Sequence, residues 1–135
     1  HTYPLNQLQF KTIGRIPVVD GRINGKRAFF IIDTGASISI LNESDARHFG
    51  FRCFSTTDQN VVGFGGESKI SEAFDCIVEF GPLTVKGVVF RTRCLNDFTE
   101  IIRQRENISI AGIIGADILD RYKIAIDFRN NTISF

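Results

Sequence analysis

Short apolar segments separated by Gly and Asn run through almost the whole chain, and this feature limits it to a mainly β fold. Ile16–Ile23 and Ala28–Ile32 flank the pair Asn24-Gly25. Because Asn and Gly readily reach the positive φ angles of a type I′ turn, we expect a β-hairpin there. Ile124–Phe128 and Thr132–Phe135 lie on either side of a polar turn and predict a second hairpin at the end of the chain.

Between these hairpins the sequence predicts further short strands and few helices. The expected strands are Phe51–Thr57, Asn60–Val62, Lys69–Phe80, Leu83–Arg91 and Ile110–Ile114. The expected helices are Asn42–Gly50, Asn96–Glu106 and Ala116–Tyr122, the second of them with Phe98, Ile101 and Ile102 on one face. The fold class is therefore all-β with two or three short helices.

The length and composition indicate an ordinary globular protein. A chain of 135 residues can bury its own core, so we expect a single domain over residues 1–135. Hydrophobic residues at 43% and charged residues at 23% argue against disorder. The formal net charge of +1 gives no general attraction to nucleic acid. No apolar run approaches the roughly 18 residues that a membrane-spanning helix needs.

The start of the chain and its cysteines bear on the compartment. The chain opens at His1 without an initiator Met or a signal pattern, and we expect a mature or trimmed fragment of a longer protein. A mature or trimmed chain favours a periplasmic or secreted location but leaves the compartment open. Cys53, Cys76 and Cys94 are widely spaced and odd in number, which argues against a zinc site and a disulfide framework. We expect small buried side chains, with their redox state open.

No metal or organic cofactor is expected. His1 and His48 are too few for a histidine metal site or a Ser–His triad, and His48 is expected on a helix surface. Gly63 and Gly65 suggest a phosphate-binding loop, but the third Gly of that pattern would fall at Ser68 and no helix follows.

One carboxylate, Asp33, interrupts the most apolar stretch of the chain. Phe29–Ile32 precede it and Thr34-Gly35 follow it, so the acid is expected on a tight turn at the edge of a sheet. Gly35 lets backbone N–H groups approach the carboxylate, and the Ser37 hydroxyl could add another hydrogen bond. On these residues alone, an Asp that merely caps a turn is an equal alternative.

Three segments, in this order, resemble the retropepsin-like aspartic proteases. Asp33–Ser37 (D-T-G-A-S) is similar to the active-site motif, and Val62–Glu67 lies where that family has a glycine-rich flap. Ile113–Leu119 is similar to the second signature, which packs beneath the catalytic turn and leads into a short helix. The resemblance implies an all-β acid-protease half-barrel. It is closer to bacterial and cellular members, because Ser37 and Ala116 leave no acid–arginine pair of the viral kind.

The resemblance also implies an aspartic endopeptidase that acts as a twofold homodimer. Two carboxylates share a proton and hold one water, which attacks the peptide bond. This chain has one D-T-G, while its only other Asp-Gly, Asp20-Gly21, lacks Thr and is expected at a strand-end turn or bulge. The second Asp33 must then come from another copy of the chain.

Each site residue that the resemblance implies has a role. Asp33 is the catalytic acid, Thr34 bonds across the dimer, Gly35 keeps the turn tight, and Ser37 supports the carboxylate. The expected flap residues are Gly63, Phe64, Gly65 and Gly66, which close over an extended peptide. Phe64 either lines a substrate pocket or is an exposed turn aromatic. Asp117 is expected to brace the short helix rather than take part in catalysis.

Two alternatives to a homodimeric protease remain open. The chain could be a catalytically silent peptide-binding or assembly module with the same fold, or one half of a longer two-domain protease. The intact D-T-G-A-S and the glycine-rich segment favour the enzyme. The physiological substrate, the cleavage preference and any zymogen control lie beyond the sequence.

Overall fold

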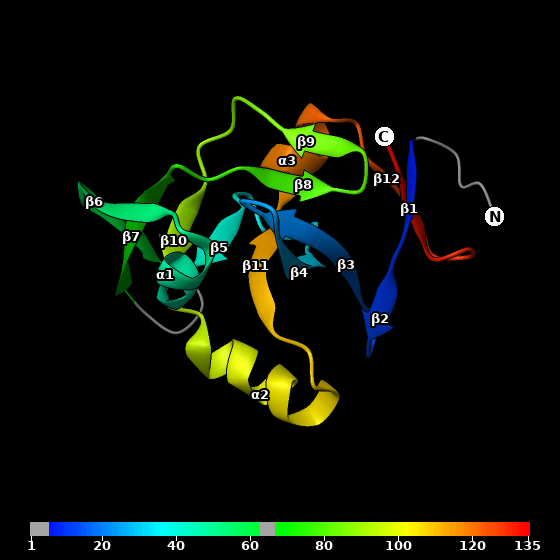
Figure 1. Ribbon diagram of the computed structural model, residues 1–135, viewed down its shortest axis with the longest axis horizontal. Coiled ribbons are helices and arrows are strands. Elements are labelled where there is room, and N and C mark those ends of the chain that lie inside the picture. The colour runs from blue at the N-terminus through cyan, green and yellow to red at the C-terminus, as the bar shows by residue number, and fades with distance from the viewer. Residues whose placement is uncertain (1–5, 63–66) are drawn as a thin grey trace.

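The computed structural model describes residues 6–62 and 67–135 and has the mainly β architecture that the sequence predicts (Figure 1). Its strands are β1 Gln7–Gln9, β2 Lys11–Ile13, β3 Ile16–Ile23, β4 Lys26–Ile32, β5 Ile40–Asn42, β6 Arg52–Val62, β7 Glu67–Phe74, β8 Val78–Phe80, β9 Leu83–Val85, β10 Arg91–Arg93, β11 Ile110–Ile114, β12 Ala125–Asp127 and β13 Thr132–Ser134. Its helices are a 3-10 turn at Glu43–Asp45, α1 Ala46–Phe49, α2 Asn96–Glu106 and α3 Ala116–Arg121.

The strands form a large sheet and a small one. The large sheet has the order β6-β7-β10-β5-β11-β4-β3-β8-β9, with β2 alongside β3. The small sheet, β1-β13-β12, joins both ends of the described chain, and Leu8 is opposite Ile133 in it. The closing hairpin predicted from the sequence is therefore confirmed.

The predicted β3–β4 hairpin is confirmed, and its turn connects several segments. Asn24 and Gly25 adopt φ angles of 50° and 80°. The Asn24 side-chain amide donates to the carbonyl oxygens of Phe49 at 3.0 Å and Asp75 at 2.8 Å. Its Oδ1 accepts from the N–H of Ile77 at 2.8 Å. One side chain thus ties the turn to the end of α1 and to the β7–β8 connection.

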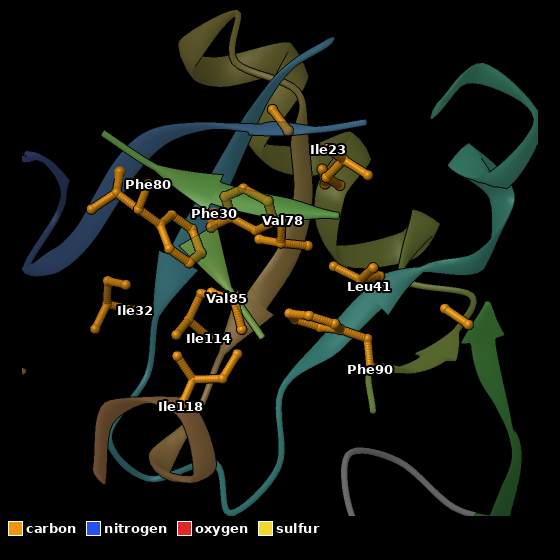
Figure 2. Packing of buried hydrophobic residues seen from close by; sticks show 14 of the residues in the cluster. Ile23, Phe30, Ile32, Leu41, Val78, Phe80, Val85, Phe90, Ile114 and Ile118 are labelled. Atoms are coloured by element: carbon orange, nitrogen blue, oxygen red, sulfur yellow. The ribbon is translucent and has the colours of Figure 1, made fainter. Parts of the chain in front are cut away.

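The centre of the large sheet is apolar on both faces. β4 pairs in parallel with β11, and β11 pairs antiparallel with β5. Alternate residues of β4 point to opposite sides, so Phe30 joins the main core while Ile31 joins a smaller cluster beneath α2. In the main core Phe30 meets Phe80 edge to face, with ring centroids 4.9 Å apart (Figure 2).

The structure corrects the strand boundaries predicted between residues 69 and 91. The single strand expected at Lys69–Phe80 is interrupted at Asp75, which has a φ of 61°. Its two halves, β7 and β8, pair with different neighbours, so the chain must turn between them. The strand expected at Leu83–Arg91 ends at Val85, before Gly87 at a φ of 68°. Conversely, the two strands expected between residues 51 and 62 are one, β6.

Two further expectations need correction. Asp20-Gly21 is not a strand-end turn or bulge, because it lies within β3, where Gly21 is opposite Ala28. A Cβ on Gly21 would lie 2.4 Å from the Glu79 carbonyl oxygen, so strand β8 can approach only a glycine. The helix at Asn96–Glu106 is confirmed, but Phe98 and Ile101 keep 39% and 54% of their surface exposed.

No helix in the described ranges 6–62 and 67–135 is both long enough and apolar enough to cross a membrane.

Replacing Asn24 by Ala should destabilise the fold. The change removes three side-chain hydrogen bonds, and we expect it to lower the free energy of unfolding by about 2 kcal/mol more than Asn131→Ala does. Asn131 is a matched control because it has nearly the same φ, 54°, and makes no side-chain hydrogen bond with the described residues. Equal losses for the two variants in urea unfolding would contradict this role.

Candidate active site

The backbone hydrogen bonds around Asp33 fix its position at the end of β4. Its N–H donates to the carbonyl oxygen of Ile114 in β11 at 2.9 Å. The N–H of Gly35 donates to Asp33 Oδ1 at 2.9 Å, and the N–H of Ala36 donates to the Asp33 carbonyl oxygen at 3.2 Å. The half-buried carboxylate therefore sits on a tight turn with an amide aimed at it, as the sequence predicts.

The segment after β11 packs directly against this turn. A Cβ on Gly115 would lie 2.6 Å from the Ala36 carbonyl oxygen and 2.7 Å from that of Ile38, so only Gly fits. The N–H of Ala116 donates to the Ala36 carbonyl oxygen at 2.7 Å. The two signatures, which lie far apart in the sequence, thus form one backbone unit.

Ser39, which the sequence analysis did not single out, locks these segments together. Its buried hydroxyl donates to Asp117 Oδ1 at 2.7 Å and accepts from the N–H of Gly115 at 2.8 Å. The N–H of Ser39 donates to Asp117 Oδ2 at 3.1 Å. Asp117 Oδ1 also accepts from the N–H of Ile118 at 2.8 Å, so this acid braces the start of α3. A serine inside the apolar run Ile38–Leu41 was the available signal, because a buried hydroxyl needs a partner.

The other predicted site residues lie around the same turn or outside the described part. Thr34, Gly35 and Ser37 are exposed in the single chain. The Ser37 hydroxyl makes no hydrogen bond to Asp33 or to any other described residue. The expected flap residues, Gly63–Gly66, lie outside the described residues.

A cavity of about 640 Å³ opens beside Asp33. Ile31 of β4, Ile113 of β11 and Ile40 of β5 are neighbours across the sheet, and all three line the cavity. The cavity therefore lies over the face of the sheet that carries α2. The residues lining it are Arg15, Ile16, Pro17, Ile31, Ile32, Asp33, Thr34, Ala36, Ile38, Ile40, Arg93, Cys94, Leu95, Asp97, Phe98, Ile113, Ile126 and Phe128. A mostly apolar cleft with few charged groups suits an extended peptide.

The cysteines differ from the buried set that the sequence predicts. Cys94 is exposed and lines the cavity, whereas Cys53 and Cys76 are half-buried, and all three are free thiols. Burial raises the pKa of Cys76 to about 12, so it remains protonated at neutral pH. Among the described side chains, at residues 6–55 and 70–135, no three His, Cys, Asp or Glu form a cluster that could hold a metal ion.

Comparison with known proteins connects this geometry to one group. A family model described as "gag-polyprotein putative aspartyl protease" matches residues 19–121. Among solved structures, a retropepsin-like aspartic protease from Rickettsia conorii is 18% identical, with a TM-score of 0.60, and the match covers 98% of this chain and 94% of that one.

Two further structures have the same fold. EIAV protease in complex with the inhibitor HBY-793 is 16% identical, with a TM-score of 0.59 over 87% of this chain and 98% of that one. The retroviral protease-like domain of Ddi1 from Leishmania major is 19% identical, with a TM-score of 0.57 over 87% of this chain and 86% of that one. The all-β retropepsin-like fold that the sequence predicts is confirmed.

Ser39 and Ser37 offer a matched pair of substitutions. Ser39→Ala leaves the Gly115 N–H without its partner and removes one of the two hydrogen bonds to Asp117 Oδ1, and we expect it to lower the free energy of unfolding by about 2 kcal/mol. Ser37→Ala should change it by less than about 0.5 kcal/mol, because the side chain is exposed and unbonded. Urea denaturation of both variants measures the difference, and a neutral Ser39→Ala would refute the role assigned to Ser39.

Proposed function

This chain belongs to the gag-polyprotein aspartyl protease family, and we propose that it is an aspartic endopeptidase that activates water between the Asp33 carboxylates of two copies. The observation that carries the proposal is the position of Asp33. Asp33 lines a mostly apolar cavity, on a turn bonded to β11 and braced through Ser39 and Asp117. Such a turn holds a carboxylate still while one side of it faces the space where a peptide can lie.

The proposed reaction needs two carboxylates with one proton between them. The ionised Asp33 takes a proton from the water, whose oxygen attacks the peptide carbonyl carbon. The protonated Asp33 gives its proton to the carbonyl oxygen, forming a tetrahedral diol. As the C–N bond breaks, the nitrogen takes up a proton from one carboxyl group and the diol hydroxyl returns one to the pair. Water has then been added across the bond and the acids are restored.

The requirement for a second copy follows from how the other acids are used. Asp20, in the only other Asp-Gly, forms a surface ion pair with Arg27 at 2.7 Å. Both carboxylate oxygens of Asp117 accept hydrogen bonds from Ser39. Asp97 also lines the cavity, but it lies in the first turn of α2 and follows no D-T-G turn. A symmetry-related Asp33 supplies the missing group through an isologous contact.

The remaining site residues complete the proposal. Thr34 is exposed beside Asp33, so its hydroxyl is free to bond to the other copy, while Gly35 donates to the carboxylate. Ser37 would support the outer carboxylate oxygen once the dimer forms. Gly63–Gly66, between β6 and β7, would act as the flap that bonds the substrate backbone, with Phe64 against a side chain. The whole of residues 1–135 would act as one domain.

Asp33→Asn should abolish peptide hydrolysis. An amide cannot act as the base, so we expect kcat to fall by about 10³-fold or more in a mixed peptide library at mildly acidic pH. A statine-type inhibitor should block the wild-type protein. Asp20→Asn is the matched control, since it changes an exposed Asp in the other Asp-Gly, and it should retain activity.

Three outcomes would contradict the proposal. Cleavage that survives Asp33→Asn would show that Asp33 is not the catalytic acid. Equal loss in Asp97→Asn would indicate a pair of acids within one chain. Wild-type protein that binds peptides without cleaving them would be a silent binding module.

A further inference from the structure

The cavity beside Asp33 contains an arginine that no acid of the described chain neutralises. Arg93, the last residue of β10, lines this cavity and is half-buried. Its Nε is shielded from solvent and has no hydrogen-bond partner among the side chains that the structure describes, those of residues 6–55 and 70–135. A shielded donor on a charged group is costly unless something binds it, so this atom calls for a partner.

Apart from Arg91, the other arginines of the described chain are exposed. Arg22, Arg27, Arg52 and Arg103 lie at the surface and each pairs with an Asp or Glu side chain. Arg93 has no acid within 4.0 Å among the described residues, although Asp97 lines the same cavity. The charged side chains in the lining are two cations, Arg15 and Arg93, and two acids, Asp33 and Asp97. Arg15 is exposed, so Arg93 is the half-buried cation of this cavity.

The surroundings of Arg93 favour an anionic ligand. Its neighbours along the chain and in the cavity include Leu95 and Phe98, and the sheet beneath contributes isoleucines. Apolar walls weaken the screening of a charge, which strengthens its attraction to an opposite charge. A guanidinium also matches a carboxylate in shape, because two N–H groups can donate to its two oxygens.

The same cavity contains Asp33. The ligand that enters it is therefore the peptide to be cleaved, and the carboxylate belongs to an Asp or Glu side chain of that peptide. A scissile bond at Asp33 places the neighbouring substrate side chains within this cavity. Resting on the proposed function, we infer that Arg93 selects peptides that carry an Asp or Glu side chain close to the cleaved bond. Arg93 is then a specificity-determining residue, and the substrates are acidic segments of polypeptide.

A cleavage profile tests this inference. The full chain would digest a proteome-derived peptide library, and mass spectrometry would count each residue type at the four positions on either side of the cleaved bonds. We expect Asp and Glu to be enriched at one of these positions. For a matched pair of synthetic peptides, with Glu or Gln at that position, kcat/KM should favour Glu by about tenfold.

Variants assign the preference to one side chain. Arg93→Gln should reduce the Glu-to-Gln ratio to near one, and Arg93→Glu should shift the preference to Lys and Arg at the same position. Arg91→Gln is the matched control, since Arg91 lies two residues earlier on the same strand, is opposite Glu72, and does not line the cavity. It should keep the wild-type ratio. If neither Arg93 variant folds, Arg93→Lys should fold and retain a preference for Glu.

Several results would overturn the inference. Cleavage that depends on Asp33 but shows no preference for acidic residues would refute it and leave the proposed function intact. An acidic preference that persists in Arg93→Gln would do the same. A Glu-to-Gln ratio lost equally in Arg91→Gln would indicate a general surface charge effect. No cleavage by the wild-type protein would overturn both this inference and the proposed function.

Discussion

The hydrogen bond from the Asp33 N–H to the Ile114 carbonyl oxygen joins the end of β4 to the end of β11, and the candidate site depends on it. Without further contacts, a carboxylate at the edge of a sheet would lie on a loop with no fixed position. Here Gly115 packs against the loop, which is possible only because Gly115 lacks a Cβ, and the Ser39–Asp117 hydrogen bonds fix it further. These interactions are internal to one chain, so the acid is fixed before any partner or substrate arrives.

In the proposed reaction, one chain supplies only one of the two acids that the chemistry needs. Asp33 and the exposed Thr34 line the cavity. Among the other acids, Asp20 is in a surface ion pair, Asp117 braces the start of α3, and Asp97 lies on α2. Chemistry between two like acids requires them close together with a shared proton. A twofold pairing of identical turns meets that requirement without a second D-T-G in the sequence. In the same cavity, Arg93 gives a single chain the means to choose a substrate.

Local signals predicted the fold and the tight turn that carries Asp33, and long-range contacts account for the rest. Asn24-Gly25 specified its hairpin through the φ angles it can reach, and α2 and β11 have the predicted boundaries. The break at Asp75 was missed because it depends on which distant strands β7 and β8 join. Ser39 and Arg93 were missed for a similar reason. Their roles arise from Asp117 and from a cavity formed by several elements, neither of which lies nearby in the sequence.

Subunit mixing tests the shared site most directly. Wild-type protein and the Asp33→Asn variant would be combined in varying proportions at constant total concentration, allowed to exchange, and assayed for peptide hydrolysis. If each active centre needs an Asp33 from both copies, activity falls as the square of the wild-type fraction, to about one quarter at an equal mixture. Activity that falls in direct proportion to the wild-type fraction would show that one chain is catalytically complete and would contradict the account.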